Sequence, residues 1–437
     1  MLSCYGYEEP ISPNIDAIAE SGFRFTQAIT GGSWTQAAFP VIMTSTYASM
    51  YGGCLGPLSP ERPSPVEALS DFGYRTAGFS TSPLLSRKFG YQRGFAHFSE
   101  LTPKERDPRL RNIKGGERLL RNPLSHYLFD LFGVRMPPAR LYVSAERLQD
   151  QFVDWVKNAE APYFAWLHYM DVHWPYHKDN ALDTPYKIAQ AWKDLSHMHR
   201  INWKGEAITA ENRERYFQLY KEAVKYTDFH IGQLFQFLER SGQLENTVVI
   251  ILSDHGEEFF EREHWGHFEI NLFDEILKVP LIVSLPGNRQ GKIVDAQVST
   301  LDIMPTLLEL CHCPIVPGME GRSLMPLLNG QANGYDRQEA ISEMWRPHRH
   351  IVALRNEEYK YIWDSENPDQ PKFFDLSSDP KEQDNLYQKN PKQVKYFHEK
   401  LSCHLEKANL TQPESAASEM DYDEDMVRRL RDLGYLE

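Results

Sequence analysis

Acidic and histidine side chains gather where one apolar segment ends. The run VVIIL (248–252) reads as a buried strand, and Asp254 and His255 follow it after a single serine. A carboxylate beside an imidazole at a strand end suits a divalent metal ion, although such a pair also occurs as a purely structural feature. Two more histidines, His264 and His267, follow three residues apart, a spacing that lets them share a helix face or converge in a loop.

A second polar cluster follows another apolar run, YFAWLHY (163–169). The segment LHYMDVHWPYH supplies the polar side chains of His168, Asp171, His173 and His177. Each of these is individually typical of packing or of the surface. If both apolar runs are strands of one sheet, however, their ends meet at the same edge, where one pocket can collect the two sets of side chains.

A lone hydroxyl precedes a short apolar helical pattern in GGSWTQAAFPVIMTS (31–45). By residue preference Thr35 is a plain helix N-cap. The same geometry also has a functional interpretation, because unpaired amides and the positive end of the helix dipole favour a sulfate or phosphate at that point. A divalent ion bound to the Thr35 hydroxyl would lower its pKa and shield the charge of the substrate.

Helical and strand patterns alternate through most of the chain. Helices are predicted at 12–22, where Pro13 suits the first turn, and at 213–243, where an apolar stripe ends near Gly242. Strands are predicted at 23–29, 74–81, 163–169, 248–252 and 279–287, and a further helix in STLDIMPTLLELC. This alternation predicts an α/β fold with a mostly parallel sheet flanked by helices and a site at the carboxyl ends of its strands.

The pattern changes beyond about residue 335. HIVALRNEEYKYIWD and KFFDLSSDP read as hairpin strands, and a charged helical tail follows. We therefore expect a catalytic domain at 1–333 and a small antiparallel α+β subdomain with the tail at 334–437.

The overall charge limits the partners of the protein. Its 437 residues carry a formal net charge of −14 at pH 7, which argues against nucleic acid and means that an anionic substrate needs a local cation. The segment 104–121 is the exception, with seven basic and three acidic residues, and reads as a solvated insertion or a lid. No run is long and apolar enough for a membrane span, and the five cysteines favour a reducing compartment, so a cytoplasmic location is expected for the sequence as given.

The chain resembles the sulfatase family of the alkaline phosphatase superfamily along nearly its whole length. The segments that carry the likeness, in order, include CYGYEEPISPNIDAIAESGFRFTQAIT, SWTQAAFPVIMTS, HYMDVHWPY, NTVVIILSDHGEE, LDIMPTLLEL, EGRSLMPLL and FFDLSSDPKEQDNL. The resemblance implies a sulfatase-like core around one divalent cation, expected to be Ca²⁺, with Mn²⁺, Mg²⁺ or Zn²⁺ as alternatives. Asp254 and His255 then stand at metal-ligand positions, Thr35 at the nucleophile and metal-contacting position, and His173, His264 and His267 at positions that bind the anionic group, with His173 and His267 also acting as acids for the leaving group.

Two departures from the family pattern change the expected chemistry. Sulfatases carry Cys or Ser in a Cys/Ser-x-Pro-x-Arg motif and convert it to formylglycine, whereas this chain has Thr35-Gln36-Ala37-Ala38-Phe39. Threonine cannot form that aldehyde, so no formylglycine is expected. The family's first strand, which ends in acidic metal ligands, would precede LSCYGY, so the catalytic domain is expected to be incomplete at its N-terminus.

Three functions follow from these residues. The first is a metal-dependent hydrolase of a sulfate or, given Thr35, more readily of a phosphate or phosphonate ester of a sugar, lipid or small molecule. The second is a transferase that moves a phospho-substituent through a Thr35 intermediate. The third is a catalytically inactive, sulfatase-like binding protein.

Overall fold

A computed structural model describes residues 1–102, 142–176, 184–204, 206–262, 265–267, 271–288, 290–346 and 349–411, together with a few positions at 122–128 and 426–430. The basic segment 104–121, most of the predicted C-terminal tail, and His177 and His264 lie outside the described residues. Among the helices that are described, none is long and apolar enough to cross a lipid bilayer.

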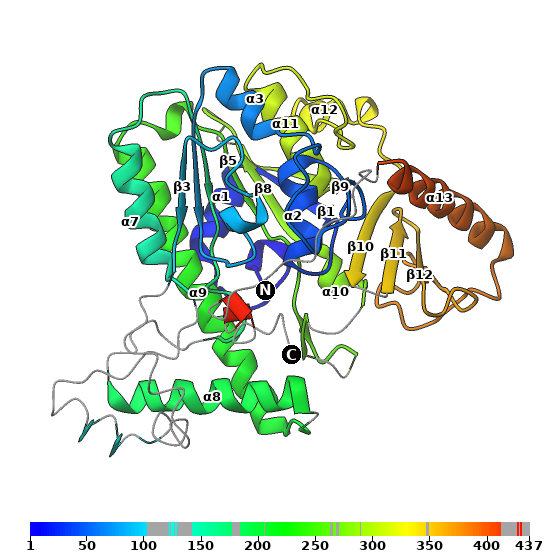
Figure 1. The fold of residues 1–437 in the computed structure, drawn as a ribbon, viewed down its shortest axis with the longest axis horizontal. Coiled ribbons are helices and arrows are strands. Elements are labelled where there is room, and N and C mark those ends of the chain that lie inside the picture. Colours follow the sequence, from blue (N-terminus) through cyan, green and yellow to red (C-terminus); the bar gives the residue numbers. More distant parts are fainter. Residues whose placement is uncertain are drawn as a thin grey trace.

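The first sheet has the order β5-β8-β1-β9 and lies at the centre of the molecule (Figure 1). Its strands are β5 (Val249–Leu252), β8 (Lys278–Ser284), β1 (Phe23–Ile29) and β9 (Lys292–Ser299). β1 and β9 are parallel, whereas β8 is antiparallel to both β1 and β5. Its apolar side chains form a core with Ile303, Leu324, Leu327 and Leu328.

A second sheet is parallel throughout and has the order β3-β2-β4. It consists of β3 (His97–Glu100), β2 (Arg75–Ser80) and β4 (Tyr163–Leu167). A two-stranded hairpin of β6 (Glu258–Phe259) and β7 (Trp265–Gly266) follows β5. The predicted α/β class with a largely parallel sheet is therefore confirmed, with β8 as the reversed strand.

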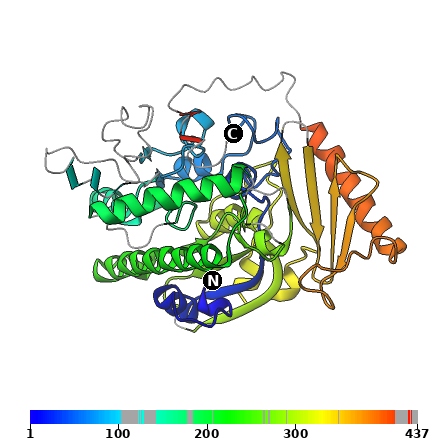
Figure 2. The same ribbon diagram turned by 90° about the horizontal axis from the view of Figure 1, so that it is seen from below.

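Helices cover both faces of these sheets. On one face α1 (Pro13–Ser21), α7 (Ala145–Val156) and the long α9 (Ala210–Arg240) pack together, and α8 (Pro185–Lys204) lies alongside α9 (Figures 1 and 2). On the other face lie α2 (Thr35–Thr44), α3 (Pro65–Asp71) and α11 (Ile303–Leu310). The remaining short helices are α10 (Asp274–Leu277), α12 (Met325–Leu328), η1 (Ser3–Tyr5), η2 (Arg87–Phe89), η3 (Leu244–Asn246), η4 (Thr300–Asp302) and η5 (Ala332–Gly334).

The C-terminal region contains the predicted antiparallel sheet. Its order is β10 (Ala340–Arg346), β11 (Arg349–Arg355), β12 (Tyr359–Asp364) and β13 (Lys372–Asp375), and α13 (Pro391–Leu410) covers its outer face (Figure 1). β10 reaches the loop after β1, since Ser342 Oγ donates to the Thr30 carbonyl at 2.5 Å and the Glu343 amide donates to the Gly31 carbonyl at 2.9 Å. The loop before Thr35 is thus fixed between the two regions.

A buried ion cluster also joins the regions. The Asp274 carboxylate, at the start of α10, accepts from Lys360 Nζ at 2.7 Å and from Arg355 Nη2 at 3.1 Å. Lys360 is completely buried. Burial alone raises the pKa of Asp274, but the charges of Lys360 and Arg355 outweigh it and hold that pKa well below its usual range.

This pKa shift predicts acid sensitivity. A carboxylate whose pKa is lowered by folding stabilises the protein fully above its unfolded pKa of about 3.9, and the contribution is lost as the pH falls below that value. We expect urea unfolding to show a stability loss as the pH falls from about 4 toward 2. Asp274→Asn should already lower the free energy of unfolding by about 3–5 kcal/mol at pH 6, because Lys360 then loses a carboxylate partner. Below pH 5 the stability of this variant should change less with pH than that of the wild type. Equal losses in both proteins would contradict this assignment.

Candidate functional site

The polar end of β5 is the centre of the site. Asp254 and His255 follow the strand directly, and Gly256 then lets the chain turn closely against α10. A β-carbon at Gly256 would lie 2.2 Å from the Glu275 carbonyl oxygen, so no side chain fits there, and the Gly256 amide donates to the Ile276 carbonyl at 2.7 Å. Glycine at position 256 is therefore required by packing.

Asp254 and His255 present two electron-pair donors to the same space. His255 Nδ1 is 2.9 Å from the Gly256 carbonyl, which can only accept, so a neutral His255 carries its lone pair on Nε2. That Nε2 atom is 3.5 Å from Asp254 Oδ2. Burial alone raises the pKa of Asp254, but the neighbouring imidazoles, His255 first among them, outweigh it and lower that pKa.

This donor set fits a divalent cation. An ionised carboxylate and an imidazole oriented by a backbone carbonyl are the ligand types that such ions take in proteins. Within the described part of the chain, no group of three or more His, Cys, Asp or Glu side chains is arranged to hold a metal ion. Asp254 and His255 are the two candidate ligands at this site.

Two further histidines pack against His255. The ring centroids of His255 and His267 are 4.3 Å apart, and those of His267 and His173 are 5.0 Å apart. Burial holds the pKa of His267 well below its usual range and lowers that of His173 to about 3, and neighbouring positive charge acts in the same direction on both. The imidazoles of His173 and His267 are therefore uncharged at neutral pH.

Glu257 orients one of these rings. Its Oε1 lies 2.9 Å from His267 Nδ1, so that nitrogen donates to the carboxylate when the glutamate is ionised. Burial raises the pKa of Glu257 to about 7, against the opposing charge of His255. Sequence reasoning did not single out Glu257, although its place two residues after His255 was the available signal.

Side chains after β4 contact side chains after β5, but the two strands lie in different sheets and not in the single sheet that was predicted. His168 is buried, and burial lowers its pKa to about 4, although the charge of Asp254 opposes this shift. Its ring centroid lies 5.2 Å from that of Phe39 in α2, and Thr81 Oγ1 donates to its backbone carbonyl at 2.7 Å. His168 thus fills the space between the site and the first turns of α2.

Thr35 is the first residue of α2 and is 2% exposed. Trp34, not Thr35, occupies the N-cap position, so the expectation of a plain threonine cap was wrong. The loop before it contacts the site directly, because the Thr30 hydroxyl donates to the Asp254 carbonyl. Gly32 allows this loop to fold onto the helix, since a β-carbon there would lie 2.5 Å from the Ala37 carbonyl carbon.

Arg346 supplies the positive charge that the acidic composition lacks. It ends β10, and its guanidinium carbon lies 4.1 Å from the centroid of the Trp34 ring, next to Thr35. Its charge contributes to lowering the pKa of His267, after burial and His255. Nothing local in the sequence marked Arg346, because it reaches the site only through the docking of β10 on the loop after β1.

The comparison with family models matches most of the chain. The sulfatase model covers residues 1–313, and the C-terminal model of N-sulphoglucosamine sulphohydrolase covers 263–410. The chain belongs to the sulfatase family. This sulfatase-family chain is 29% identical to arylsulfatase K of Gallus gallus over 57% of its own length and 53% of that relative. It is 27% identical to an ulvan-active sulfatase of Formosa agariphila over 86% of its length and 72% of the relative.

Among solved structures, a phosphonate monoester hydrolase of Agrobacterium radiobacter shares the fold of this sulfatase-family chain. The TM-score is 0.70 at 20% sequence identity, over 93% of each chain. The chain spans about half the length of arylsulfatase K and 35% of a choline-sulfatase from Rhizobium meliloti, to which it is 33% identical over 42% of its own residues.

Proposed function

We propose that this chain is a metal-dependent hydrolase that cleaves a phosphate or phosphonate ester with Thr35 as the nucleophile. The observation that carries the proposal is the pairing of Asp254 Oδ2 with His255 Nε2 at the end of β5, next to the loop that leads into Thr35. Two imidazoles, from His173 and His267, and the Arg346 guanidinium complete a site for an anionic ester. The phosphonate monoester hydrolase with the same fold is consistent with this reaction class.

Threonine favours phosphorus over sulfur at this position. In the proposed reaction the Thr35 oxygen bonds to phosphorus while its proton passes to the neutral imidazole of His173 or His267. The bond to the leaving alkoxide breaks, and the imidazolium gives that alkoxide the proton. Water then attacks the phosphorus of the threonine ester and regenerates the hydroxyl. A sulfated threonine lacks the formylglycine hydrate's route of collapse to an aldehyde, so hydrolysis of sulfate esters would stall after the first step.

Asp254 and His255 are the residues that would hold the cation, with the Thr35 hydroxyl beside it. When bound, a divalent ion would lower the pKa of that hydroxyl and offset the negative charge of the ester. Ca²⁺ is the ion expected from the family, with Mn²⁺, Mg²⁺ and Zn²⁺ as alternatives. The α2 N-terminus and Arg346 add positive potential from the protein itself.

A substrate panel tests this proposal. The protein is assayed with each of the four metal ions and with chelator. The substrates are p-nitrophenyl sulfate, p-nitrophenyl phosphate, p-nitrophenyl phenylphosphonate and the diester bis-p-nitrophenyl phosphate. We expect turnover of at least one phosphorus ester and none of the sulfate, with unmodified Thr35 verified by mass spectrometry. Sulfate turnover by unmodified Thr35, or binding of every ester without cleavage, would overturn the proposal. Product analysis with added alcohol separates hydrolysis from transfer.

Arg346 is predicted to bind the anionic oxygens of the substrate. Arg346→Gln should raise KM about tenfold or more with a smaller change in kcat, because a charge-assisted contact to the bound ester is lost. Arg349→Gln is the matched control, since Arg349 lies opposite Arg346 across the β10–β11 pair but is bound to Asp364 at 2.6 Å. Equal effects of the two substitutions on KM would mean that Arg346 acts only through the general charge of this surface.

A further inference from the structure

The loop from the end of β5 to the start of α10 carries two of the site side chains. Glu257 precedes the β6–β7 hairpin and His267 follows it, so the location of both side chains depends on where the hairpin lies. The hairpin has only two residue pairs, Glu258 with Gly266 and Phe259 with Trp265. A ladder this short does not hold its own position in water. Something outside it must fix the loop.

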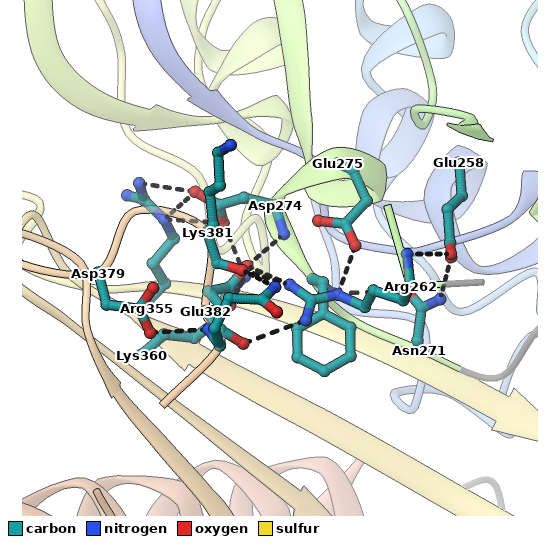
Figure 3. Close-up of polar contacts among 12 residues, drawn as sticks. Glu258, Arg262, Asn271, Asp274, Glu275, Arg355, Lys360, Asp379, Lys381 and Glu382 are labelled. Carbon is teal, nitrogen blue, oxygen red and sulfur yellow. Dashed lines mark hydrogen bonds and ion pairs between the residues drawn. The ribbon is translucent and has the colours of Figure 1, made fainter. Parts of the chain in front are cut away.

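Arg262, between the two hairpin strands, makes the outside contacts (Figure 3). Its Nε donates to Glu275 Oε1 at 2.5 Å, while Nη1 and Nη2 donate to the carbonyls of Glu382 and Lys381 at 3.1 and 2.9 Å. Its guanidinium carbon also lies 3.4 Å from the centroid of the Phe273 ring. One side chain thus joins the hairpin to α10 and to the segment after β13.

The segment that receives Arg262 is itself rigidly held. Glu382 has a φ of 53°, a left-handed conformation that a residue with a β-carbon adopts only where its surroundings impose it. Its buried carboxylate accepts from the Asp274 amide at 2.8 Å and from Lys360 Nζ at 2.7 Å. Lys360 in turn pairs with Asp274, so the contacts of Arg262 end on the buried ion cluster (Figure 3).

The first strand of the hairpin is held in place through Glu258, which follows Glu257 in the sequence. Glu258 is completely buried, and its carboxylate accepts from the Arg262 amide at 3.1 Å and from Asn271 Nδ2 at 3.0 Å. Arg262 therefore lies between two carboxylates of its own region and two carbonyls of the C-terminal segment. Its planar group, with donors in fixed directions, suits this bridging better than a lysine would.

We propose that Arg262 is a positioning residue, which holds Glu257 and His267 in place by anchoring the β6–β7 hairpin to residues 381–382. The C-terminal segment then acts on the site from outside it. The catalytic consequence rests on the proposed hydrolase function. The conformational consequence does not, because the hairpin loses its anchor without Arg262 whatever reaction the site performs.

The experiment compares Arg262→Gln, Arg262→Lys and a control in the full chain. Arg93→Gln is the matched control, because Arg93 also binds one carboxylate, Glu67 at 2.8 Å, and one carbonyl, Arg62 at 2.9 Å, outside this loop. Hydrogen exchange of peptides spanning 257–267 is measured by mass spectrometry, together with thermal unfolding and with kcat and KM for the best ester.

We expect Arg262→Gln to speed exchange in 257–267 by about tenfold or more, with Arg262→Lys intermediate and Arg93→Gln unchanged. The kcat should fall in the same order while KM changes less. Unchanged exchange in Arg262→Gln, or equal acceleration in Arg93→Gln, would overturn the proposal. If the wild type cleaves no ester, the hydrolase proposal fails, and the exchange comparison still decides the role of Arg262. Should Arg262→Gln not fold, the comparison is made with Arg262→Lys.

Discussion

Thr35→Val is expected to lower the turnover of a phosphorus ester by at least about a thousandfold, since it removes the nucleophile. Valine has nearly the shape of threonine, so the substitution removes one oxygen from a buried position at the start of α2 without opening a cavity. Steady-state kcat and mass spectrometry of the quenched reaction measure the effect. In the wild type a covalent phospho-adduct should be trapped on Thr35, and in the variant no adduct should form.

Two controls separate chemistry from folding. Thr35→Ser keeps the hydroxyl and should keep most of the activity, although it loses the packing of one methyl group. Thr44→Val changes another buried threonine of the same helix, whose hydroxyl donates to the Pro40 carbonyl at 2.7 Å and lies 2.7 Å from Thr46 Oγ1. Turnover retained in Thr35→Val but lost in Thr44→Val would exclude Thr35 as the nucleophile.

Local patterns predicted the elements of this fold but not all of their directions. VPLIVSLPG has the continuous apolar character of a parallel strand, yet β8 runs antiparallel to β1 and β5. Strand periodicity reports which faces are buried, and it carries no information on the direction of the neighbouring strand. The helix at Thr35 was predicted correctly, but its cap was not: the helix includes Thr35, and Trp34 occupies the N-cap position without a side-chain capping hydrogen bond.

The residues of the candidate site likewise include some that local patterns predicted and one that they did not. Asp254, His255, His173 and His267 were expected together at the edge of one sheet. They do lie together, although β4 and β5 belong to different sheets. Arg346 could not be expected there, since it lies about 80 residues after His267 on a separate sheet and approaches through contacts such as that of Ser342 with Thr30. Such long-range docking depends on the complete fold and leaves no local periodicity or motif.

Metal binding gives the second large effect. Asp254→Asn should weaken the binding of the preferred divalent ion by about a hundredfold or more, as measured by calorimetric titration of the chelator-treated protein. The amide keeps the volume of the side chain, and the Asp254 backbone carbonyl still accepts from Thr30, so the loss isolates the negative charge. Titration with metal ion alone makes the result independent of catalysis.

Asp228→Asn is the control for burial of a carboxylate. Asp228 is buried, but it lies against the start of α1. Its carboxylate accepts from the Ile15 amide at 2.7 Å and from Asn14 Nδ2 at 2.7 Å. Its substitution should lower the thermal unfolding midpoint and leave metal affinity unchanged. If Asp254→Asn bound the ion as tightly as wild type, the facing lone pairs of Asp254 and His255 would not be a metal site, and the activation of Thr35 would need another source of positive charge.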